Sequence, residues 1–224
     1  MFTNRIKIGA FNMMITSYNF KQIGDVLIVV LGQDKGIQTS KKNGNIVALK
    51  NEDGKIIGYN IFNVSSITPE IKNQNGQVIL SDNQIDKLNE AIVSAGFDTK
   101  LPSKVSPKFV VGFVKSMKEH PKSSHLYITE TEVEDGKTLQ IVSSSPNMQE
   151  GIKVVVAEVG TMMPNGLIIW PSELKDVESD GMICSGRELK IPNAPDRPGA
   201  LILPDSYKIG EPFDFDKAKT LFDE

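Results

Sequence analysis

The chain has 224 residues, of which 39% are hydrophobic and 24% charged, and its formal net charge is −3. This composition is close to the globular average and excludes wholesale disorder, and no run of about 18 apolar residues is present to cross a bilayer. The acidic balance argues weakly against a nucleic-acid partner, because proteins that neutralise phosphates usually carry a basic excess. The N-terminus lacks the apolar core of a signal peptide, so a cytoplasmic protein without a membrane partner is expected.

The first hundred residues begin with patterns typical of strands. Residues 24–32 form an apolar run bounded by glycines, which indicates a buried strand. Two further runs, 45–50 and 55–62, flank Asp53-Gly54, a dipeptide that supplies the positive φ angles of a tight turn. The sequence therefore predicts a strand and a β-hairpin.

A helix is expected next. Ser81 and Gln84 have the spacing of a capping box, and apolar residues follow at helical spacing as far as Gly96, a left-handed stop. Strands, hairpin and helix together predict a small α+β domain over residues 1–100. No catalytic cluster stands out in it, and its role cannot be inferred from the sequence.

The second half predicts a mainly β domain behind a linker. Residues 101–107 carry two prolines among small and polar residues, which is typical of a connector. Short strands separated by turn signals are typical of a sandwich or small barrel. Six such runs follow the connector: 109–117, 126–133, 139–143, 153–159, 166–170 and 200–203. We expect a barrel domain over 108–215 and a solvated acidic tail over 216–224.

A set of local strings in residues 109–189 is more specific than the strand pattern. It includes His120-Pro121, Pro146-Asn147 and the run Ser179-x-Gly181-Met182-x-Cys184-Ser185-x-Arg187-Glu188-Leu189. In this order the strings resemble the oligonucleotide-binding (OB) tRNA-binding domain that is fused to bacterial methionyl- and phenylalanyl-tRNA synthetases. With an α+β domain in front, the chain is similar to the free-standing bacterial YtpR-type tRNA-binding proteins in particular.

The resemblance implies a non-catalytic tRNA-binding protein without a cofactor, and it implies contacts at the rim of an OB barrel. The residues that it points to are Asn147, Ser179, Met182, Ser185 and Arg187. Hydroxyl and amide groups can bond phosphates or base edges, a thioether can pack on a base, and an arginine is a fixed cation.

Each of these assignments has a structural alternative. In that alternative, Ser179 caps the turn that leads into Gly181, and Met182 is a core residue. Likewise, Asn147 holds the turn after Pro146, and Arg187 pairs with Glu188 or Glu178. The sequence leaves both interpretations open.

The chain also departs from the family pattern. Where the family usually has His-Pro-x-Ala-Asp-Lys-Leu, this sequence has His120-Pro121-Lys122-Ser123-Ser124-His125-Leu126, so an aspartate and a lysine are replaced. The loss of a basic position predicts recognition of tRNA by shape and stacking more than by charge.

Two other function classes compete with this interpretation. An enzyme would use Cys184 as nucleophile with His120 or His125 as base, but the mostly apolar neighbours of the thiol do not favour a reactive thiolate. As the single cysteine, Cys184 also forms no internal disulfide and lacks the partners of a metal site. The second alternative is an OB protein-interaction module, for example a partner of an aminoacyl-tRNA synthetase, with little tRNA affinity. Because the family often dimerises, the resemblance also implies a homodimer.

Overall fold

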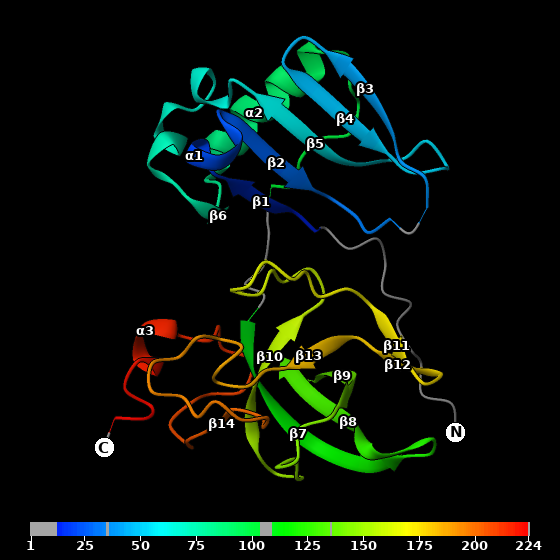
Figure 1. Cartoon of the computed structure of the whole chain (residues 1–224), viewed down its shortest axis with the longest axis vertical. Coiled ribbons are helices and arrows are strands. Elements are labelled where there is room, and N and C mark those ends of the chain that lie inside the picture. Colours follow the sequence, from blue (N-terminus) through cyan, green and yellow to red (C-terminus); the bar gives the residue numbers. More distant parts are fainter. Residues whose placement is uncertain (1–12, 35, 104–108, 135, 224) are drawn as a thin grey trace. The chain divides into compact units, whose positions relative to one another are not determined.

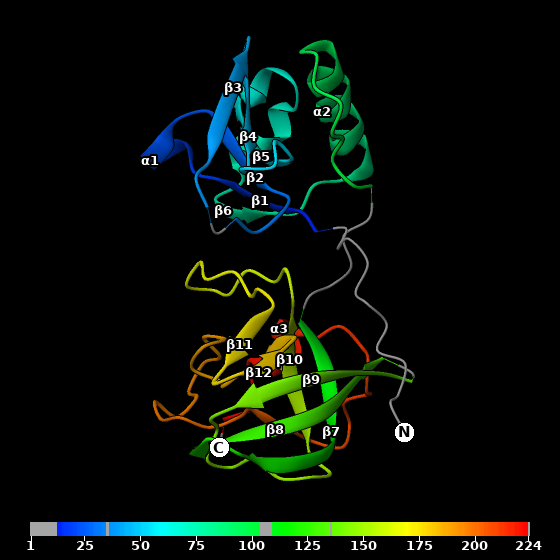
Figure 2. The same cartoon turned by 90° about the vertical axis from the view of Figure 1, so that its right-hand side faces the viewer.

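The structure is a computed structural model that describes residues 13–34, 36–103, 109–134 and 136–223. The chain divides into two compact units, Met1–Ser106 and Pro107–Glu224 (Figures 1 and 2). Residues 104–107 of the expected linker lie outside the described residues. Each unit has its own hydrophobic core and is described by itself.

The first unit is a six-stranded antiparallel sheet in the order β3-β4-β5-β2-β1-β6, with a helix packed against one face (Figure 2). Its strands are β1 (Ile15–Tyr18), β2 (Val26–Val30), β3 (Thr39–Asn43), β4 (Ile46–Lys50), β5 (Ile56–Phe62) and β6 (Gly76–Val78). The helical elements are α1 (Phe20–Ile23), the 3-10 turns η1 (Val64–Ser66) and η2 (Pro69–Asn73), and α2 (Asp82–Ser94). Apolar residues at helical spacing on α2 are buried against the sheet. This architecture confirms an α+β first domain.

The local signals of the first half are confirmed. The Ser81 hydroxyl and the Gln84 side chain form the expected capping box of α2, and Gly96 has a φ of 74° after the helix. Beyond Gly96, the backbone of Leu101 is bonded to the side-chain amide of Asn89 on α2. The amide accepts from the Leu101 N–H at 2.7 Å and donates to the Leu101 carbonyl at 3.1 Å. Leu101 is buried in the first core, so the start of the expected linker is anchored to this unit.

The second unit is a nearly closed β-barrel. Its main sheet has the order β13-β10-β7-β8-β9, with β14 beside β10 and a separate ribbon formed by β11 and β12. The strands are β7 (Phe109–His120), β8 (Ser123–Glu134), β9 (Lys137–Ser143), β10 (Lys153–Glu158), β11 (Ser172–Leu174), β12 (Val177–Ser179), β13 (Gly181–Ile183) and β14 (Ile202–Leu203). The Asp180 N–H donates to the Gln140 carbonyl at 2.9 Å and joins the two ends of the sheet. A barrel closed in this order confirms the expected OB architecture.

The barrel has one core inside and a second outside. Along β10 the side chains alternate, so Val154 and Val156 belong to the interior cluster whereas Val155 and Ala157 belong to another. The outer cluster is covered by the C-terminal segment, which includes Tyr207, Phe213 and the short helix α3 (Phe215–Ala218). The barrel wall formed by β7, β10 and β13 is therefore covered by the chain itself.

The C-terminal segment differs from the solvated tail expected over residues 216–224. Ala218 is fully buried, and Leu221 and Phe222 pack against the outer cluster. The acidic residues Asp216, Asp223 and Glu224 flank these apolar ones in the sequence, so the high charge of the segment concealed its buried side chains.

Two of the six expected runs are also corrected. Residues 166–170 form no strand, because this loop folds back on itself through a single bridge between Met162 and Ile168. Residues 200–203 contribute only the two-residue β14. The ribbon of β11 and β12 was not anticipated, since three-residue strands give almost no periodic signal.

Candidate nucleic-acid interface

Ser179 lies at the closure of the barrel. Its side chain is only 2% exposed, and its Oγ accepts from the Val142 N–H at 3.0 Å and donates to the Gly181 carbonyl at 3.2 Å. Gly181, with a φ of 151°, approaches β10 so closely that an added Cβ would lie 3.1 Å from the Ala157 carbonyl oxygen. In this structure the Ser179 hydroxyl therefore links β9 to the chain entering β13.

Met182 lies on β13 opposite Ala157 and is partly buried at the edge of the outer cluster. Cys184 follows at 0% exposure, with its Sγ donating to the Met182 carbonyl at 3.6 Å. Burial, and secondarily the nearby Glu188 carboxylate, raises the pKa of the Cys184 thiol to about 12. A thiol in this environment stays protonated at neutral pH, which disfavours a nucleophilic role.

Ser185 begins a tight turn at the end of this strand. Its N–H and hydroxyl both donate to the Glu188 carboxylate, at 2.8 and 2.6 Å, and its Oγ accepts from the Glu188 N–H at 3.3 Å. The Ser-x-x-Glu spacing in the sequence is the signal of this capping arrangement. It fixes the turn from which the Arg187 side chain projects.

Arg187 is the exposed cation of the predicted set. Its guanidinium lies 3.4 Å from the Asp196 carboxylate, and the two side chains are 44% and 95% exposed. Neither Glu188 nor Glu178, the partners considered from the sequence, takes part in this pair. Exposed pairs are worth about 0 to 1 kcal/mol, so phosphate can compete for Arg187 at little cost.

Asn147, in the connection between β9 and β10, is bonded to the segment that leads into β14. Its side-chain amide accepts from the Ala200 N–H at 2.7 Å and donates to the Ala200 carbonyl at 3.0 Å. The next residue, Leu201, donates its N–H to the Cys184 carbonyl at 2.8 Å. The structure thus brings Asn147, Ser185 and Arg187 to one loop cluster, while Ser179 lies at the strand closure.

The charges on the barrel are uneven. Glu130 and Glu132 on β8 lie on the outer face of the sheet that β8 forms with β7. The Lys115 ammonium on β7 lies 3.6 Å from the Glu132 carboxylate. Three of the other lysines donate to backbone carbonyls: Lys153 to those of Asp205 and Tyr207, Lys175 to that of Lys122, and Lys190 to that of Pro164. The outer face of β8 is therefore acidic, and the lysines form no single basic stripe.

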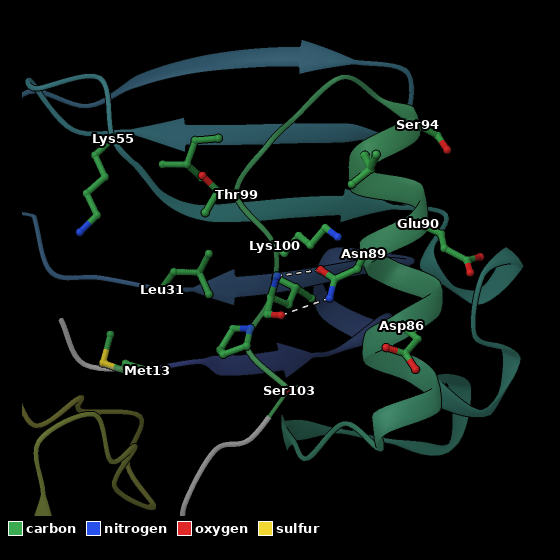
Figure 3. Close-up of a pocket in the computed structure, with 14 residues that line it drawn as sticks. Met13, Leu31, Lys55, Asp86, Asn89, Glu90, Ser94, Thr99, Lys100 and Ser103 are labelled. Carbon is green, nitrogen blue, oxygen red and sulfur yellow. Dashed lines mark hydrogen bonds between the residues drawn. The ribbon is translucent and has the colours of Figure 1, made fainter. Parts of the chain in front are cut away.

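The first unit has an open groove between α2 and residues 99–103 (Figure 3). Asp86 and Glu90 stand on α2, Lys55 lies across the groove, and all three are exposed. The amide of Asn89 is already bonded to Leu101, as the dashed lines mark. The polar groups of the groove are thus solvated or already paired.

The described residues also bear on metal binding and on membrane spanning. Among those residues no group of three or more His, Cys, Asp or Glu side chains is placed to hold a metal ion. Nor does any helix within the described ranges have the length and apolar character needed to cross a membrane.

Comparison with known proteins assigns a family to each unit. Residues 109–212 match the family described as "Putative tRNA binding domain", and residues 33–104 match "Domain of unknown function (DUF4479)". The chain is 38% identical over 135 residues to the "Phenylalanine--tRNA ligase beta subunit" of Burkholderia lata, a match that covers 56% of this chain and 16% of that subunit. The solved "Crystal structure of MetRS related protein from Pyrococcus horikoshii" covers 46% of this chain and 84% of that chain, at 16% identity and a TM-score of 0.33.

A further relative matches both units. The chain is 41% identical over 200 residues to the "Putative tRNA-binding protein YtpR" of Bacillus subtilis (strain 168), and the match covers 88% of this chain and 98% of that protein. Because this identity extends along nearly the whole of both proteins, the chain belongs to the YtpR family.

Proposed function

We propose that this chain is a non-catalytic tRNA-binding protein that contacts tRNA through the rim of its OB barrel. The observation that carries the proposal is the match of the barrel to the tRNA-binding domain family within a relative that shares both units. Loops at the rim of an OB barrel set its ligand, and aromatic, cationic and polar groups there hold bases and phosphates.

Within the predicted set, Arg187 and Met182 can touch RNA without giving up a buried partner, whereas the amide of exposed Asn147 is bonded to Ala200. Arg187 offers a fork of donors to a phosphate in place of its exposed partner Asp196. Met182 is partly exposed on β13, where a polarisable thioether can pack on a base.

The other three stabilise the strand that carries Met182 and the turn that carries Arg187. Ser179 bonds the closing strands, Ser185 caps the turn that carries Arg187, and Asn147 fixes the chain at Ala200. Their direct contact with tRNA remains part of the proposal. It requires their polar groups to exchange a protein partner for an RNA partner.

Electrostatics favour an approach from the rim. The outward carboxylates of Glu130 and Glu132 would repel phosphates on the open face of β8. A net charge of −3 leaves little general attraction, so shape and stacking must supply much of the affinity.

The same acidic face favours a second candidate function, a protein-interaction module with little tRNA affinity. The similarity to a synthetase subunit makes an aminoacyl-tRNA synthetase the first partner to test. We further propose a cytoplasmic homodimer, in line with the family resemblance, and size-exclusion chromatography with light scattering would measure the dimer directly.

The function is tested by fluorescence anisotropy or gel shift with bulk tRNA and with double-stranded DNA. We expect micromolar or tighter tRNA binding at low salt, no aminoacylation or hydrolysis of the tRNA, and weaker binding of the DNA. Arg187→Gln should weaken tRNA binding, whereas Lys219→Gln, which removes an equal charge just after α3, should not. A chain that binds no tRNA at low salt would be a protein-interaction module instead.

A further inference from the structure

The turn between β7 and β8 is fastened to the ribbon of β11 and β12 by a buried histidine. His120, 3% exposed, ends β7, and its Nε2 lies 3.0 Å from the carbonyl oxygen of Leu174 on β11. The N–H of Lys122 lies 3.0 Å from the other ring nitrogen, Nδ1. One imidazole therefore joins parts of the chain that are 54 residues apart.

These partners define the protonation state of the ring. A carbonyl oxygen can only accept, so Nε2 must carry the hydrogen that it donates to Leu174. A backbone N–H can only donate, so Nδ1 must be unprotonated to accept from Lys122. The contact needs the neutral Nε2–H tautomer, because a proton on Nδ1 would face the Lys122 N–H.

The ribbon depends on outside support. It consists of three residue pairs, Ser172 with Ser179, Glu173 with Glu178 and Leu174 with Val177. Its tip residues, Lys175 and Asp176, both have positive φ, 48° and 69°, although neither is glycine. Isolated two-stranded ribbons are marginally stable in water, and this turn adds backbone strain.

Further contacts at the tip come from the same turn. Lys122 pairs with Asp176, and the Lys175 ammonium donates to the Lys122 carbonyl at 3.2 Å. The far end of the ribbon is Ser179, which leads through Asp180 into β13 and Met182. The placement of the ribbon thus influences both the barrel closure and the strand that carries Met182.

We propose that His120 is a positioning residue for RNA binding, which in its neutral form joins the turn between β7 and β8 to the ribbon of β11 and β12 as one phosphate-binding rim. This inference rests on the proposed function. The two joined segments belong to the connections between the first and second and between the fourth and fifth barrel strands, the loops with which OB barrels bind oligonucleotides. Exposed Lys118, Lys122 and Lys175 are the cations of this rim.

The proposal makes an unusual prediction about acid. Added positive charge alone should strengthen binding to RNA, but protonation of His120 should weaken it by releasing the ribbon. The turn, the ribbon and the adjoining ends of β7 and β8 carry these charged or titratable side chains besides His120: Lys118, Glu119, Lys122, His125, Glu173, Lys175, Asp176 and Glu178. The chain has two histidines, so exposed His125 is a matched control on the neighbouring strand.

The test compares His120→Gln and His125→Gln with the parent protein. Bulk-tRNA affinity at neutral pH should fall about tenfold in His120→Gln and stay unchanged in His125→Gln. Nitrogen NMR of the parent should show one ring, absent from His120→Gln, as the Nε2–H tautomer. Amide exchange of residues 172–179 should accelerate in His120→Gln while the rest of the barrel keeps its protection.

If His120→Gln is poorly folded, the parent and His125→Gln are compared at neutral and mildly acidic pH. Both should lose tRNA affinity as the His120 NMR signals report protonation. Parent-like binding by a folded His120→Gln with faster exchange in the ribbon, or tighter binding by the parent with His120 protonated, would overturn the proposal. If the parent binds no tRNA at any pH, the proposed function fails, whereas the NMR and exchange data still test the contact.

Discussion

Two buried hydroxyls and one exposed cation lie close together in the sequence within residues 179–188. Ser179 is the clearest case, because its hydroxyl satisfies the buried Val142 N–H. Ser179→Ala should lower the free energy of unfolding by about 1 to 3 kcal/mol, the cost of a buried group left without its partner. Urea unfolding measures this, with exposed Ser172→Ala on the facing strand as the control that should lose much less, because its hydroxyl makes only a 3.5 Å contact with the Ser179 carbonyl. Normal stability with lost tRNA affinity would instead make Ser179 a direct RNA contact.

Met182 separates binding from packing in a different way. If its exposed side stacks on a base, Met182→Ala should cost roughly 1 to 2 kcal/mol of tRNA binding. Because it lies only partly within the outer cluster, the accompanying loss of stability should be about 1 kcal/mol, less than for a fully buried methionine. Titration with tRNA and urea unfolding give the two numbers.

Met148→Ala is the matched control, since Met148 is 7% exposed in the interior core. It should lose roughly 2 to 5 kcal/mol of stability and affect binding only through unfolding. If Met182→Ala behaves in the same way, the stacking role of Met182 is excluded.

Cys184 tests the competing enzyme hypothesis. Its folded-state pKa is raised from 9.0 to about 12, chiefly by burial, so the native thiol should resist alkylation by iodoacetamide at pH 8 and react fully in urea. The raised pKa contributes stability below pH 9, and this contribution is lost as the pH rises towards 12. Mass spectrometry after timed alkylation decides the point, and rapid native labelling would revive a nucleophilic role.

At the scale of elements, the sequence predicted what is locally encoded. The capping box at Ser81, the hairpin around Asp53-Gly54 and the long strands of the barrel carry short-range signals, and the structure has them. The family string likewise pointed to a candidate interface within residues 147–187, which stays a prediction. Neither kind of signal carries information on which side chains are buried. Neither could therefore show that the hydroxyls of Ser179 and Ser185 are hydrogen-bonded within the protein while Arg187 is exposed.

What the sequence missed depends on distant contacts. The ribbon of β11 and β12 is bonded to His120 at the end of β7. The C-terminal segment packs on the outer face of β7 and β10. Short segments of this kind have too few residues for a periodic pattern. Their position is decided by surfaces that exist only after the barrel has formed.

Phe222 shows that the C-terminal segment supports the candidate interface. An added Cβ on Gly186 would lie 3.3 Å from the Phe222 ring. The ring therefore packs closely on the turn that carries Arg187. Phe222→Ala should therefore lower stability by roughly 1 to 3 kcal/mol, less than for a fully buried ring, and weaken tRNA binding by loosening the turn.

Lys219→Ala is the control for Phe222→Ala, because its exposed pair with Asp216 contributes little. Thermal melts and tRNA titrations of the two variants should differ clearly. If Phe222→Ala is as stable as the parent, the result would support the solvated tail that the charge of this segment suggests.

For the whole molecule, the separate cores predict that the barrel unit folds by itself. Residues 107–224 contain both the interior and outer clusters, so this fragment should unfold cooperatively in urea. A fragment with no cooperative transition would mean that the units depend on each other for folding.

The strength of tRNA binding by the whole chain should depend only modestly on salt. Each phosphate contact adds about −0.7 to −0.9 to the slope of log K against log salt concentration. With Arg187 and a few rim lysines available and the outer face of β8 acidic, we expect two to four contacts and a slope of about −1.4 to −3.6. Arg187→Gln should make the slope shallower by about one, whereas Met182→Ala should weaken binding and leave the slope unchanged. Anisotropy titrations over a salt series measure all three slopes, and a parent slope near −8 would show that a wide basic surface, rather than the barrel rim, holds the tRNA.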